Sequence, residues 1–130
     1  MISTQINKAS NRPTEFFGKL FQIRDQMHIN HLRISGTGSY AGHMALGSFY
    51  DDLLGLVDTL IESYQGKYGI MDITIPSSSK TEPIATLKDL AKLTDGGSAY
   101  SMFKETWLQN QIDEISTLAY QTIYKLENLK

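Results

Sequence analysis

One stretch of the chain holds four side chains that could bind a metal ion: His31, His43, Asp58 and Glu62. Their spacing is H-x11-H-x14-D-x3-E. Imidazole nitrogens combined with carboxylate oxygens suit divalent transition-metal ions. Asp51 falls on the same stripe of the predicted helix and adds a fifth candidate ligand. The pattern therefore indicates a metal site in this stretch.

The two ends of this pattern are too far apart for one chain to close them on a single ion. A glycine-containing turn at residues 35–39 separates His31 from His43 and reverses the chain. Asp58 then lies roughly 22 Å along the following helix from His43, at a rise of about 1.5 Å per residue. A two-fold dimer with antiparallel helices would bring both histidines of one chain against Asp58 and Glu62 of the other. We therefore expect a homo-oligomer built from two-fold dimers.

The same side chains also have a purely structural interpretation. His31 and His43 would then only hydrogen-bond near the glycine turn, and Asp58 and Glu62 would belong to a solvated helix face. Apolar residues flank Asp58 on both sides, so its carboxylate needs a partner. A metal ion, a histidine or an arginine such as Arg24 could supply that partner.

Helical periodicity in the rest of the chain predicts the elements that position these residues. Apolar side chains recur every three or four positions from about Pro13 to Ile34 and from about Tyr40 to Gln65. A shorter helix is predicted from about Pro83 to Leu93, and a last one from Glu105 to nearly the end of the chain. Between the second and third helices, Ile70 to Glu82 lose the helical period and form a long connection over the bundle. The economical arrangement is an all-α antiparallel four-helix bundle with a shortened third helix.

Composition limits the domain organisation and the function classes. The chain has 130 residues, a net charge of -2, no cysteine and a hydrophobic fraction of 41%. These values predict one soluble bundle domain at residues 13–130, preceded by a flexible polar arm at residues 1–12. No apolar run approaches the roughly 18 residues of a membrane span, so we expect no membrane contact and a cytoplasmic location. The acidic balance argues against a nucleic-acid partner.

The His31–Glu62 stretch resembles the ferritin-like mini-ferritins, usually called Dps, whose ferroxidase centre lies at a dimer interface. Residues at the matching places, with the family's spacing, are His31, Gly36, His43, Asp58 and Glu62. The resemblance implies a ferritin-like bundle that binds iron (Fe2+/Fe3+), with zinc or another divalent ion in its place as the alternative. It also implies oxidation of Fe(II) by peroxide or oxygen, the activity of a ferroxidase.

A second resemblance covers most of the chain. Small uncharacterised ferritin-like proteins of tailed phages have similar HxxH, GxFYDxLLxLxD and WxQNQIDEI segments. Here these segments are His28–His31, Gly47–Asp58 and Trp107–Ile115. This resemblance implies the same fold, and it places a phage-encoded protein in the host cytoplasm.

Two positions depart from the Dps pattern. Gly47 stands where that family has an aspartate, and Leu32 stands where it has a tryptophan. Loss of a carboxylate weakens iron binding, and Asp51 could replace it only if the backbone or a water makes up the distance. Gly47→Asp is accordingly expected to tighten Fe(II) binding. The departures favour the alternative function, a catalytically inactive ferritin-like structural or interaction protein encoded by a phage.

Overall fold

The computed structural model describes residues 2–77 and 82–130, and every regular element in them is a helix. The elements in chain order are α1 (Ile2–Arg33), α2 (Ser39–Tyr68), α3 (Pro83–Thr94), the single-turn α4 (Ser98–Ser101) and α5 (Thr106–Asn128). Helix α3 has 12 residues, against 32 in α1 and 30 in α2. The predicted all-α bundle with a shortened third helix is confirmed.

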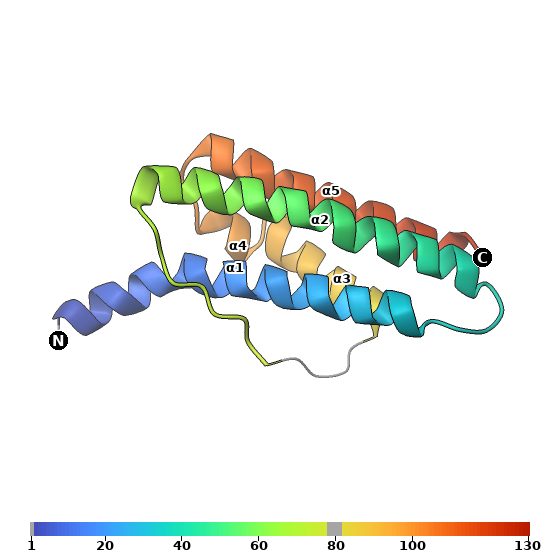
Figure 1. The fold of residues 1–130 in the computed structure, drawn as a ribbon. Helices are drawn as coiled ribbons and strands as arrows, with labels where there is room; N and C mark the ends of the chain where they lie inside the picture. Colours follow the sequence, from blue (N-terminus) through green and yellow to red (C-terminus); the bar gives the residue numbers. More distant parts are fainter. Residues whose placement is uncertain (1, 78–81) are drawn as a thin grey trace.

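The four long elements pack as an antiparallel bundle (Figure 1). Helices α1 and α5 run in one direction, and α2 and α3 run in the other. Helix α1 packs on α2, α2 packs on α5, and α5 packs on α3, so each of these pairs is antiparallel. Helices α2 and α3 are therefore parallel to each other.

Two glycines make the reversal between α1 and α2 possible. Gly36 has a φ of 99° and Gly38 has a φ of 78°, values that residues with a Cβ atom rarely adopt. Gly38 is also the residue that precedes the first turn of α2. The resulting hairpin sets the end of α1 beside the start of α2, where the sequence analysis places the two histidines.

The first helix begins earlier than its sequence predicts. We expect it from about Pro13, whereas α1 starts at Ile2 and Pro13 lies inside it. Proline fixes φ near the helical value and removes one N–H donor, so a helix can continue through it at the cost of a hydrogen bond. The first turns of α1 project beyond the other helices (Figure 1). The predicted helix start is therefore wrong, while the flexibility of residues 1–12 stays a prediction.

The apolar stripes of the helices meet in one core. Large side chains with less than 2% of their surface exposed include Phe17, Leu20, Phe49, Leu53, Leu87, Leu108 and Ile112. Burying one such side chain is worth about 1.5–3 kcal/mol, so this core supplies the main stabilisation of the bundle. Within the described residues, no helix is both long enough and apolar enough to cross a membrane.

The described part of the connection after α2 lies directly on α1 (Figure 1). Nε2 of the buried Gln22 donates a hydrogen bond of 2.6 Å to the carbonyl oxygen of Ser77. A Cβ at Gly18 would overlap the carbonyl oxygen of Thr74, so only glycine leaves room for the backbone to cross here. The predicted packing of the connection over the bundle is confirmed for this part, and residues 78–81 lie outside the described residues.

Candidate functional site

His31 and His43 form a stacked pair across the turn between α1 and α2. The ring centroids are 3.7 Å apart, and the ring planes differ by 18°. Nδ1 of His31 lies 2.6 Å from the carbonyl oxygen of His43, and Nδ1 of His43 lies 2.8 Å from the carbonyl oxygen of His31. These two reciprocal hydrogen bonds fix both rings to the backbone of the opposite helix.

The partners of this histidine pair determine which ring nitrogens are left for a ligand. A carbonyl oxygen can only accept a hydrogen bond, so each Nδ1 must carry the proton that it donates. In the neutral imidazole the lone pair is then on Nε2. Both rings are half-buried, and each presents Nε2 as its remaining donor atom for a metal. Ring orientation by an Nδ1–H bond to a backbone carbonyl is a common feature of metal-ligating histidines.

Tyr50 forms an aromatic wall beside the histidine pair. The ring of His28 stacks on Tyr50 with centroids 4.0 Å apart and an interplanar angle of 11°. His31 meets the same tyrosine edge-on, with centroids 5.3 Å apart. His28, which the sequence analysis did not select as a ligand, therefore packs against an aromatic ring. Tyr50 stands about one turn after Gly47 on the same helix, and no pattern in the sequence marks it as part of a site.

Gly47 provides the space that the imidazole of His31 occupies. A Cβ at this position would lie 2.9 Å from Cε1 and 3.1 Å from Nδ1 of His31. Any side chain at residue 47 must therefore displace the ring or its hydrogen bond to His43. An aspartate at residue 47 would therefore disturb the packing of the histidine pair. This steric conflict opposes the tighter Fe(II) binding expected for Gly47→Asp.

The three carboxylates of the predicted site lie further along α2. Asp51, Asp58 and Glu62 are exposed, and no hydrogen bond or ion pair joins them to another described residue. Within residues 2–77 and 82–130, no group of three or more histidine, aspartate or glutamate side chains is arranged to hold a metal ion. One chain therefore brings His31 and His43 together but leaves the acids apart from them, Asp51 included.

Arg24 is not the partner of Asp58. Its Nη1 lies 3.4 Å from Oδ1 of the adjacent Asp25, and its guanidinium carbon lies 5.6 Å from the centre of the Tyr50 ring. The arginine thus extends the aromatic wall beside the histidines. Asp58 is exposed, so water can solvate its carboxylate and the expectation that it needs a partner is not met within one chain.

A second polar cluster, which the sequence analysis missed, lies at the opposite end of the bundle. Glu105 is 9% exposed, and its Oε2 accepts hydrogen bonds from Lys67 Nζ at 2.6 Å and from the hydroxyl of Tyr68. The Lys67 hydrogen bond, followed by that of Tyr68, lowers the pKa of Glu105 to about 2. Burial and the charge of Glu105 raise the pKa of Tyr64. The cluster ties the end of α2 to the start of α5 and serves the fold.

Similarity to known proteins covers most of the chain. Residues 31–126 match the family model described as "Family of unknown function (DUF5856)". A protein of Enterobacteria phage T4, described as "Uncharacterized 14.6 kDa protein in mobD-ri intergenic region", is 31% identical over 119 residues. That alignment covers 89% of this chain and 88% of the phage protein. No solved structure matches the chain significantly. The region matched by the family model includes the histidine pair and all three carboxylates.

Proposed function

The chain belongs to this family of unknown function, and on that premise we propose that it forms a two-fold dimer that binds Fe(II) and promotes its oxidation. The observation that carries the proposal is the state of the histidine pair. Both Nδ1 atoms are held by backbone carbonyl oxygens, so both Nε2 atoms are left to coordinate a metal.

The remaining ligands would come from the second copy. Asp58 and Glu62 are exposed on α2 and have no partner among the described residues of their own chain. Two copies with antiparallel α2 helices would set these acids opposite His31 and His43. Each site would then combine two imidazole nitrogens with carboxylate oxygens, a donor set that suits Fe(II) and also accepts zinc or another divalent ion.

The chemical step would be a one-electron oxidation of each bound Fe(II). Two Fe(II) ions supply two electrons and the solvent supplies two protons, which together reduce one molecule of hydrogen peroxide to two molecules of water. In this proposal the chain holds the ion at the dimer interface, and the aromatic wall of Tyr50 and His28 limits the access of solvent to the histidines. The resemblance of residues 31–62 to the mini-ferritins supports iron and its oxidation over a purely structural metal.

A second candidate function is a bundle that acts only through protein contacts. Several large apolar side chains around the histidine pair are exposed: Ile29 by 52%, Leu32 by 68% and Met44 by 51%. An apolar surface of this kind favours contact with another protein or another copy of the chain. Gly47 supports the same function, because the ring of His31 occupies the space in which a carboxylate side chain at residue 47 would lie.

An anaerobic Fe(II) titration of the metal-free protein separates the two functions. We expect saturable binding by the native chain, and loss of that binding in the variant D58N/E62Q. The matched control is D113N/E114Q, which removes an exposed aspartate and an exposed glutamate from α5. Peroxide is then added, and formation of Fe(III) is followed by absorbance.

The outcomes of this titration are distinct. Binding and oxidation that D58N/E62Q abolishes and D113N/E114Q preserves would support the metal function. Equal binding by all three proteins would refute the assignment of the carboxylates. No saturable binding by the native chain, together with a dimer in sedimentation, would support the second candidate function.

A further inference from the structure

A cavity opens at the end of the bundle where the α1–α2 turn, the start of α3 and the end of α5 meet. Its volume is about 700 Å³, within the range of small-molecule sites. The cavity lies between the end of α1, the end of α5 and the first residues of α3, and α1 and α3 are not closely packed on each other. Described residues line it throughout, and it does not include the candidate metal ligands.

One wall of the cavity is apolar. It is formed by the fully buried Leu46, by Ile34 and Ile84, and by Leu126 and Leu129 near the end of α5. Ile34 lies over Gly42, where a Cβ would overlap its Cδ1 atom. These aliphatic side chains thus form an apolar wall that an alkyl group can cover.

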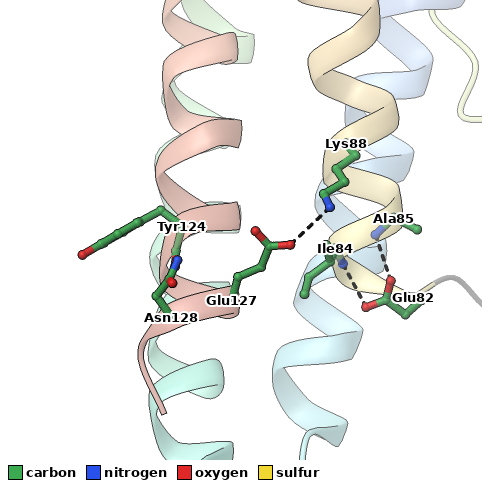
Figure 2. Close-up of polar contacts among 7 residues, drawn as sticks. All are labelled: Glu82, Ile84, Ala85, Lys88, Tyr124, Glu127 and Asn128. Atoms are coloured by element: carbon green, nitrogen blue, oxygen red, sulfur yellow. Dashed lines mark hydrogen bonds and ion pairs between the residues drawn. The ribbon is translucent and has the colours of Figure 1, made fainter.

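The charged side chains that line the cavity are two cations, Arg33 and Lys130, and one carboxylate, Glu82. Arg33 and Lys130 are exposed lining residues, and neither has an ion-pair partner in the described part of the chain. Glu82, the acidic residue of the lining, is already engaged: its carboxylate oxygens accept hydrogen bonds from the backbone nitrogens of Ile84 at 3.1 Å and Ala85 at 2.9 Å (Figure 2).

The neighbouring acid on α5 is engaged as well. Glu127 forms an ion pair of 3.2 Å with Lys88, which bridges α5 and α3 beside the cavity (Figure 2). Ser39, the first residue of α2, also lines the cavity, and no side chain caps this helix end, whereas Glu82 caps the start of α3. The two unpaired cationic side chains and the start of α2 together favour an anion over a cation.

We propose that this cavity binds a small amphiphilic anion, a molecule with one anionic group on an apolar body the size of a medium-chain fatty acid. The alkyl part would cover the wall formed by Leu46, Ile84 and Leu129. The anionic group would lie at the mouth between Arg33 and Lys130. This site is separate from the proposed metal site and does not depend on it.

Decanoate is the probe, and its binding to the full chain is measured by calorimetry. We expect saturable binding of one decanoate per chain, and weaker binding of decanol, which has the same chain without the charge. The variant R33Q/K130Q should bind decanoate about threefold to tenfold more weakly, since each exposed cation contributes a modest ion pair. The variant L129S should weaken decanoate and decanol alike, because it removes part of the apolar wall.

The matched control is R12Q/K104Q, which removes one exposed arginine and one exposed lysine elsewhere on the chain. It should bind decanoate as the native chain does. All the substituted residues are exposed, so each variant is expected to fold, and circular dichroism checks this. Unchanged decanoate affinity in R33Q/K130Q would overturn the proposal. Equal binding of decyltrimethylammonium, equal binding of inorganic phosphate, or no saturable decanoate binding would overturn it too.

Discussion

Gly47→Ala is the substitution that most directly tests the geometry of the histidine pair. The matched control is Gly55→Ala, two turns further along the same helix. A Cβ at Gly55 meets nothing within 4 Å, whereas a Cβ at Gly47 lies 2.9 Å from the ring of His31. Both changes relieve the cost of a helical glycine, which is about 1 kcal/mol. The difference between the two variants therefore isolates the contact with His31.

The structure sets the size of that difference. A normal contact between carbon atoms is about 3.5 Å or more, so the His31 ring must move by about half an ångström or more to accept the new methyl group. The His31 ring donates one hydrogen bond, of 2.6 Å, from its Nδ1 to the carbonyl oxygen of His43. Loss of this hydrogen bond costs about 1 kcal/mol.

We expect Gly55→Ala to raise the free energy of unfolding by about 1 kcal/mol. Gly47→Ala should leave it about unchanged, since the loss of the His31 hydrogen bond offsets the gain in helix propensity. Urea unfolding followed by circular dichroism measures both values, and NMR of the histidine rings reports whether the pair has opened. Stabilisation of both variants by the same amount would refute the packing role of Gly47, and unshifted histidine signals in Gly47→Ala would do the same.

Two further predictions concern the contact of Glu105 with the end of α2 and the place where the connection after α2 crosses α1. Glu105→Gln should lower the melting temperature near neutral pH and flatten the pH dependence of the melting temperature. The pKa of Glu105 is lower in the folded chain than in the unfolded chain. The stabilisation by its carboxylate is therefore present above about pH 4.5 and is lost as the pH falls towards about 2. An unchanged acid limb in a series of melting curves would contradict this. Gly18→Ala should destabilise the protein by about 1–3 kcal/mol, because its Cβ overlaps the Thr74 carbonyl, whereas Gly66→Ala, where a Cβ meets nothing within 4 Å, should stabilise it. Equal effects in denaturant unfolding would exclude the close crossing.

Most of the architecture could be predicted from the local pattern of the sequence. Helical periodicity and glycine turns placed α2, α3 and α5 within a few residues, since these signals act between neighbouring positions. The start of α1 was missed because a proline is most often found in a helix's first turn, and here the helix continues through Pro13. The shortened third helix follows from Gly96 and Gly97, which come just after it in the sequence.

Some features of the candidate site could also be predicted from the sequence, and others could not. Helical rise and chain reversal are local properties, so the amino-acid sequence alone predicts that His31 and His43 face each other across a turn. For the same reason it predicts that Asp58 and Glu62 lie too far along α2 to join them. Three contacts became visible only in the folded chain: each histidine Nδ1 binds the opposite carbonyl oxygen, Gly47 leaves room for the ring of His31, and Glu105 pairs with Lys67. These contacts join residues of different helices, and the packing that brings them together depends on the shape of every side chain in the core.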